Sequence, residues 1–166
     1  MSTCIHNGCV SVLCWGWISH VGVGILHRIG HMDSLQYKHI LQYVMVPSVR
    51  MFYPVGIIHF RQDYSSIHDS RVVKVWLSKK ADVELIDWPQ RAPDMNPIEN
   101  MWREVKRTMN ETSPVLPPRK SDELRTLVSN AWDEVASSQR YVRSLIESMT
   151  RRMKSVVKAK GFWTSD

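Results

Sequence analysis

The spacing of apolar side chains changes near residue 97, and this change limits the folds open to the chain. Before it, short apolar runs of strand length alternate with segments in which apolar residues recur at a helical period. After it, three longer segments carry apolar side chains every three or four residues, which is typical of amphipathic helices. This order predicts an α/β domain followed by helices.

The first part of the chain predicts six elements. Two β-rich runs separated by a turn indicate a hairpin. A segment with a helical period follows this hairpin, and Pro47 disturbs that period near its end. The order β-β-α-β-α-β predicts at least some parallel strand pairing, because a helix between two strands allows the chain to return to the same end of the sheet. The predicted elements are strands at 10–18 and 22–29, a helix at 33–49, a strand at 55–60, a helix at 71–80 and a strand at 83–88.

Three helices are predicted in the second part, at 97–109, 122–135 and 141–158. In the last of these the apolar stripe includes Met149, Met153, Val156 and Val157. The Pro-rich segment 113–120 is predicted to be a linker. We therefore expect a short N-terminal tail at 1–9, an α/β core at 10–112 and a basic helical appendage at 121–166.

Composition excludes several classes of protein. The net charge of +6 and the pI near 9.4 are compatible with a polyanionic partner. The three cysteines all lie in the first 14 residues; their odd number excludes a disulfide framework and favours a reducing compartment. The longest apolar run, at 10–18, is shorter than the roughly 20 residues that span a bilayer, and no secretory signal is recognisable. We expect neither a membrane protein nor a secreted one.

Two acidic residues each admit a structural and a functional interpretation. Asp63 lies just past an apolar run, where a carboxylate can open a turn or bind a hard cation such as Mg²⁺. Glu99 stands three residues after Asn96 and two after Pro97, which is the spacing of a helix capping box. The same helix start could also present the Glu99 carboxylate to a metal ion. Local pattern leaves both interpretations open.

Other polar residues of the chain are also functional candidates, and each has a simpler structural interpretation. The set Cys4, His6, Cys9 and Cys14 could be considered for zinc, although its spacing matches no common site. His68 is expected to be a polar loop residue. The stretch 140–160 holds seven Lys or Arg and one acid, and it is either a solvated helix face or a phosphate-contacting surface. The candidate nucleic-acid-binding residues are Arg140, Arg143, Arg151, Arg152, Lys154 and Lys158.

The run from Asp87 to Trp102 closely resembles the signature around the last catalytic acid of mariner-like transposases, which have a DDE/D endonuclease domain. Its most specific part is Pro93-Asp-Met-Asn-Pro-Ile-Glu-Asn100. The resemblance extends over about residues 10–164. It includes Ser11-Val-Leu-Cys-Trp-Gly16 with Gly22-Val-Gly24, Gln62-Asp63 with His68, and the tail 141–164.

The resemblance implies an α/β, ribonuclease-H-like fold. It also implies that Asp63 and Glu99, with 35 residues between them, are the second and third metal-binding acids. The expected cofactor is Mg²⁺ or Mn²⁺, and the expected chemistry is cleavage and strand transfer of DNA by a two-metal site. The expected partner is transposon-end DNA, with a possible homodimer in the parent family, and the expected location is the nucleus.

Two departures from the family pattern qualify this expectation. Between Asp63 and His68 the chain has residues 64–67 in place of the usual Asn and Pro. The family's first catalytic Asp lies upstream of the hairpin, whereas no Asp or Glu precedes Asp33 here. We therefore expect a truncated, inactive fragment of the domain. The alternatives are a non-catalytic nucleic-acid-binding module derived from a transposase, or a remnant without function.

Overall fold

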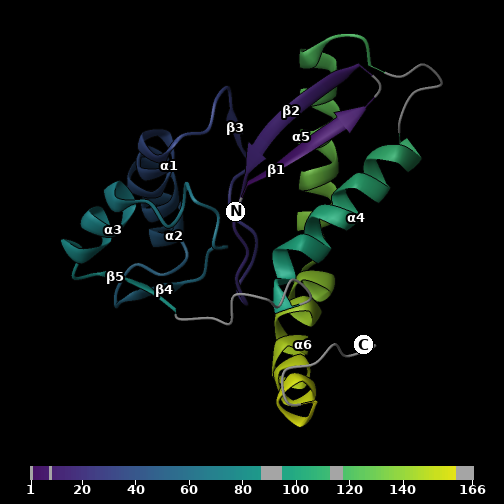
Figure 1. Cartoon of the computed structure of the whole chain (residues 1–166). Helices are drawn as coiled ribbons and strands as arrows, with labels where there is room; N and C mark the ends of the chain where they lie inside the picture. Colours follow the sequence, from purple (N-terminus) through teal and green to yellow (C-terminus); the bar gives the residue numbers. More distant parts are fainter. Residues whose placement is uncertain (1, 8, 87–94, 113–117, 160–166) are drawn as a thin grey trace. The chain divides into compact units, whose positions relative to one another are not determined.

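A computed structural model of the chain describes residues 2–7, 9–86, 95–112 and 118–159 (Figure 1). The chain divides into two compact units, each described here by itself. Unit 1 consists of residues 1–4, 12–17 and 24–91, and unit 2 of residues 5–11, 18–23 and 92–166. None of the helices in the described ranges combines the length and apolar content needed to cross a membrane.

The N-terminal strands form a sheet in the order β1-β2-β3, with bounds Ser2–Asn7, Val10–Trp15 and His27–Ile29. β2 and β3 are antiparallel, with Leu13 opposite Ile29 and Trp15 opposite His27, so the predicted hairpin pairing is confirmed. The structure adds β1, where the sequence predicted only a tail. Pairing with β2 gives its backbone partners and Ile5 is fully buried, which explains why this short segment is ordered as a strand.

A glycine is required between β2 and β3. A Cβ atom on Gly24 would lie 2.1 Å from the ring of Trp17, and the Gly24 N–H donates to the Trp17 carbonyl at 2.9 Å. The Trp17 ring is in turn fixed by its Nε1–H, which donates to Ser48 Oγ at 2.8 Å. The chain therefore approaches Trp17 more closely than any side chain at position 24 would permit.

The predicted helix at 33–49 is present as three consecutive segments: α1 (Ser34–Ile40), a π-helical turn η1 (Leu41–Met45) and α2 (Val46–Arg50). Asp33 caps α1 by accepting from the Gln36 N–H at 2.7 Å. Pro47 has no N–H to donate to the preceding turn, and that turn widens, so that the Val46 N–H donates to the Leu41 carbonyl. The disturbance predicted at Pro47 is thus a widened turn within a continuing helix.

Strands β4 (Ile58–Phe60) and β5 (Val83–Leu85) pair in parallel, with Ile58 opposite Val83, as predicted from the strand–helix–strand order. Helix α3 (Arg71–Ser78) connects them and buries Val73 and Trp76. β5 is shorter than the predicted strand at 83–88, of which residues 87 and 88 lie outside the described residues.

The loop before β4 is held by one arginine, which explains why the strand begins at residue 58 rather than 55. Arg50 donates from Nη1 to the carbonyl of Gly56 at 2.8 Å and from Nη2 to Asp82 Oδ2 at 3.0 Å. Gly56 has a φ of +86°, a conformation that favours glycine.

The core of unit 1 lies between these helices and strands. Its buried residues come from every element between β2 and β5. They are Trp15, Ile29, Tyr37, Ile40, Leu41, Met45, Val49, Ile58, Val73, Trp76 and Val83.

Unit 2 contains α4 (Pro97–Thr112), α5 (Ser121–Ser137) and α6 (Gln139–Lys158), which contact one another. The buried rings of Trp102 and Trp132 join α4 to α5 with centroids 4.7 Å apart. Tyr141 Oη donates to the Asn100 carbonyl at 3.3 Å and joins α6 to α4. All three predicted helices are confirmed. Helix α4 belongs to the same compact unit as α5 and α6, and the expected domain boundaries at 10–112 and 121–166 stay a prediction.

The apolar stripe predicted along α6 is buried only at its start. Val142 and Leu145 are buried, but Met153 is 40% exposed and Val157 is 77% exposed. Met149 and Val156 are partly exposed. The prediction of a buried stripe is therefore wrong from Met149 onward, because the last turns of α6 extend past α4 and α5 (Figure 1). Residues 113–117 of the predicted linker lie outside the described residues, and the linker stays a prediction.

Candidate functional site

Asp63 lies three residues past the last residue of β4, at the carboxyl end of a strand that pairs in parallel. In open α/β sheets this is the position from which side chains reach a binding crevice. The Asp63 side chain is 41% exposed, whereas the preceding Gln62 is buried. The chain thus passes from the core to the surface at this residue.

Hydrogen bonds from neighbouring residues hold the Asp63 carboxylate. Oδ1 accepts from the Ser65 N–H at 3.2 Å and lies in close hydrogen-bond contact with His68 Nδ1. Both of these contacts end on Oδ1, and a hydrogen bond from the Ser65 side chain also reaches the carboxylate. Burial alone would raise the pKa of Asp63, but the hydrogen bond and charge of His68, together with Ser65, outweigh burial and lower the pKa. Asp63 is therefore an ionised carboxylate at neutral pH, with Oδ1 held by its neighbours.

His68 is not the polar loop residue that the sequence predicted, because its side chain is only 2% exposed. Its ring lies against the ring of Tyr37, with centroids 3.8 Å apart. Tyr37 Oη donates to Gln62 Oε1 at 2.8 Å, and Gln62 Nε2 donates to the His68 carbonyl at 3.2 Å. Burial, and secondarily the charge of Asp63, raises the pKa of Tyr37. These contacts tie Asp63 to the buried side of α1, and no local sequence signal indicated them.

Glu99 is exposed on the first turn of α4, which begins at Pro97 as predicted. Asn96 is buried, and its Nδ2 donates to Glu99 Oε1 at 2.9 Å, while the Glu99 N–H donates to the Asn96 carbonyl at 3.0 Å. The amide of Asn96 thus holds one oxygen of the Glu99 carboxylate, and the capping box stays a prediction. Asp94, the neighbouring acid in the motif, lies outside the described residues.

Asp63 and Glu99 each fit as a ligand of a hard divalent cation. Both are carboxylates with one oxygen held by a neighbour, and carboxylate oxygens are ligands that Mg²⁺ and Mn²⁺ accept. Asp63 belongs to unit 1 and Glu99 to unit 2, and each is described within its own unit.

The zinc alternative is not supported. Cys4 and Cys9 are exposed and Cys14 is buried in β2. In the described part of the chain, no three His, Cys, Asp or Glu side chains gather closely enough to hold a metal ion.

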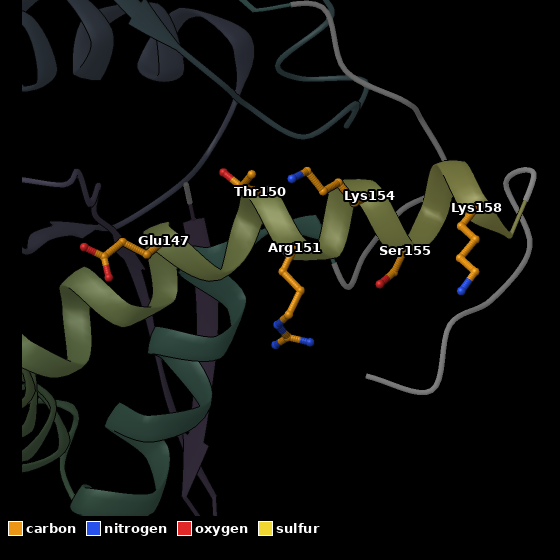
Figure 2. Close-up of a pocket in the computed structure, with 6 residues that line it drawn as sticks. All are labelled: Glu147, Thr150, Arg151, Lys154, Ser155 and Lys158. Atoms are coloured by element: carbon orange, nitrogen blue, oxygen red, sulfur yellow. The ribbon is translucent and has the colours of Figure 1, made fainter.

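The basic residues of α6 are mostly exposed. Three of them, Arg151, Lys154 and Lys158, line a pocket of about 440 Å³ together with Glu147, Thr150 and Ser155 (Figure 2). Figure 2 shows Thr150 and Lys154 along one edge of the pocket-lining face of α6, and Arg151, Ser155 and Lys158 along the other edge. Arg152 is partly buried, unlike its neighbours Arg151 and Lys154. Arg140 and Arg143 are exposed at the start of α6. Glu147 is the acid within this stretch, and it lies 3.6 Å from His20.

Comparison with solved structures shows the fold. The catalytic domain of the Mos1 mariner transposase matches with a TM-score of 0.76, at 14% identity, over 99% of this chain and 82% of that one. The Mos1 paired-end complex with Mn matches with a TM-score of 0.75, over 97% of this chain and 46% of that one. The chain thus has the α/β, ribonuclease-H-like fold of a transposase catalytic domain, as expected from the resemblance.

Comparison of sequences shows the family. The profile described as "DDE superfamily endonuclease" matches residues 33–121, more than half of the chain. The Tc1 transposase of Caenorhabditis elegans is 34% identical over 161 residues, and the Tcb1 transposase of Caenorhabditis briggsae is 35% identical over 161 residues. In both cases the match covers 96% of this chain and 56% of the relative, so the chain spans about half of their length. The chain belongs to the DDE superfamily of endonucleases, and it is similar in sequence to Tc1-type transposases.

Proposed function

We propose that Asp63 and Glu99 are two of the three metal-binding acids of this DDE endonuclease domain, and that the 166 residues do not cleave DNA by themselves. The observation that carries the proposal is the state of Asp63. It is an ionised, half-exposed carboxylate at the end of a parallel strand, with Oδ1 held by its neighbours. This is the arrangement that a fixed oxygen ligand requires.

A third acid is not supplied by the residues before Asp63. The acid that precedes it in the sequence is Asp33, and no Asp or Glu lies between these two or before Asp33. Asp33 caps α1 through its side-chain bond to the Gln36 N–H, which is a structural role. A two-metal site built from these residues therefore holds two of the acids that the family uses.

Bound divalent cations would polarise the phosphodiester and lower the pKa of the attacking water. The chain's own contribution is to hold two carboxylates in fixed positions. Asp63 is held through His68 and Ser65, and Glu99 through the amide of Asn96. The solved Mos1 catalytic-domain structures with Mn and with Mg are in keeping with the use of either cation.

The proposed DNA-binding surface is one face of α6. At about 100° per residue, Arg140, Arg143, Arg151, Lys154 and Lys158 fall within an arc of about 80°. Val142 and Leu145, which are buried, lie on the other side of the helix. Arg152 falls next to Leu145 on this projection, in agreement with its partial burial. Cations aligned in this way suit contacts with the phosphates of DNA, which give affinity without sequence preference.

This surface favours the second candidate function, a nucleic-acid-binding module without catalysis. The two proposals are compatible in one chain, because the α6 face does not depend on Asp63. Mos1 is described in paired-end complexes and with a left transposon end. By analogy we propose transposon-end DNA as the partner of a longer parent protein, a homodimer as its active form, and the nucleus as the place where it acts.

The proposal is tested by incubating supercoiled plasmid with the purified chain and Mg²⁺ or Mn²⁺, with Asp63→Ala as the matched control. We expect no nicking above the control level by either protein. Metal-dependent nicking that Asp63→Ala abolishes would show that the 166 residues already form a complete catalytic site.

A further inference from the structure

We infer that His68 is a positioning residue for the Asp63 carboxylate, holding Oδ1 through Nδ1–H so that the carboxylate keeps one orientation toward a cation. The inference rests on the proposed role of Asp63 as a metal ligand and goes beyond it, since it assigns a role to a residue outside the three acids. The His68 side chain is 2% exposed, and the Asp63 side chain that it contacts is 41% exposed.

The contact links two side chains of very different mobility. A half-exposed aspartate would ordinarily exchange between rotamers, because nothing in solvent fixes its χ1 angle. His68 Nδ1 is in close contact with Asp63 Oδ1, and the Ser65 N–H donates to the same oxygen at 3.2 Å. Both contacts fall on Oδ1, so together they select one orientation of the carboxylate.

Both the imidazole ring and the backbone of His68 are held by buried neighbours. The Tyr37 ring lies against the imidazole, with the centroids 3.8 Å apart and the planes inclined by 31°. Gln62 Nε2 donates to the His68 carbonyl at 3.2 Å, and Gln62 Oε1 accepts from Tyr37 Oη at 2.8 Å. Tyr37, Gln62 and His68 therefore close a buried network, and Asp63 is its exposed end.

The direction of the hydrogen bond follows from the chemistry of the two groups. An ionised carboxylate has only acceptor sites, so the hydrogen between Oδ1 and Nδ1 belongs to the imidazole. Networks of this kind around metal sites orient the ligand, and removing an outer member typically lowers metal affinity by about 10–100-fold. His68 would act in this way through Asp63, without touching the cation.

The alternative is that His68 only fills the core beneath the loop. Two substitutions separate these roles. His68→Asn places an amide N–H near the position of Nδ1 and keeps a donor for Asp63. His68→Gln places its amide near the position of Nε2 and removes that donor, while keeping a polar side chain of similar volume.

The first experiment needs no metal. Three-bond ¹⁵N–¹³C and ¹³C–¹³C couplings in the labelled chain report the χ1 angle of Asp63. We expect values for a single rotamer in the wild-type chain and in His68→Asn, and averaged values in His68→Gln. A single Asp63 rotamer in folded His68→Gln would overturn the inference, as would averaging in folded His68→Asn; thermal melting shows whether each variant is folded.

A second measurement on the wild-type chain keeps the test decisive should a variant fail to fold. A long-range ¹H–¹⁵N correlation spectrum identifies which imidazole nitrogen of His68 carries hydrogen. We expect hydrogen on Nδ1, and a ring with hydrogen on Nε2 alone would overturn the inference. Because neither readout involves a metal, either can fail while Asp63 still binds Mn²⁺, and the proposed function is then judged separately.

Discussion

Tyr37 Oη donates a 2.8 Å hydrogen bond to Gln62 Oε1, and both side chains are buried. The bond joins α1 to the residue directly before Asp63. It satisfies the buried amide oxygen of Gln62, whose Nε2 donates to the His68 carbonyl, and so holds the chain that leads from β4 to Asp63. The core of unit 1 thus extends to the candidate metal ligand.

Tyr37→Phe should destabilise the chain, because it leaves the Gln62 amide oxygen buried without a donor. The expected loss is about 1–3 kcal/mol in the free energy of unfolding. Urea denaturation measures it, with Tyr43→Phe as the matched control because Tyr43 is exposed. Equal stability of Tyr37→Phe and the control would show that the bond contributes nothing to folding.

The same residue predicts how stability depends on alkaline pH. Burial raises the pKa of Tyr37 above its ordinary value of 10.0. A group whose pKa is raised on folding contributes stability below its unfolded pKa and loses that contribution as the pH rises above it. Unfolding free energy should therefore fall above pH 10. Tyr37→Phe should show a shallower decline between pH 10 and 11.5, and identical slopes in the two proteins would contradict the assignment.

Local patterns predicted most of the elements of this fold but not the network around Asp63. Helices such as α4 and strands such as β4 have apolar periods that the sequence displays directly. The burial of His68 depends on Tyr37, which belongs to another helix, so no window around His68 contains the cause. The burial predicted for Met153 was wrong for a similar reason. The period of α6 shows an apolar stripe, but it does not show where the helices that cover this stripe end. Asp63 and Glu99 were singled out as metal ligands by family resemblance, because position alone favoured a turn for Asp63 and a helix cap for Glu99.

DNA binding by the α6 face should depend strongly on salt. With three or four phosphate contacts, log K should fall with log salt at a slope of roughly −3, and the Kd should be about 10⁻⁴–10⁻⁶ M at physiological salt. The double variant Arg143→Gln/Lys154→Gln should flatten the slope by about 2. Fluorescence anisotropy with a labelled duplex between 50 and 300 mM salt measures both quantities.

The control for this prediction is Arg71→Gln/Lys79→Gln, which removes two exposed cations from α3 and the residue after it. Its net charge equals that of the α6 variant, so only location differs. Equal slopes in the two double variants would contradict a specific α6 surface and favour the solvated-face interpretation.

We propose that Asp63 and Glu99 are ligands of divalent metal in the same catalytic site, and paramagnetic broadening by Mn²⁺ tests this proposal most directly. Amide signals are recorded for the labelled chain as Mn²⁺ is added, for wild type, Asp63→Asn and the control Asp69→Asn. Shared ligation predicts that signals around Asp63 and at the start of α4 broaden together, and that Asp63→Asn abolishes both effects while Asp69→Asn abolishes neither. Broadening at the start of α4 that survives in Asp63→Asn would contradict the proposal.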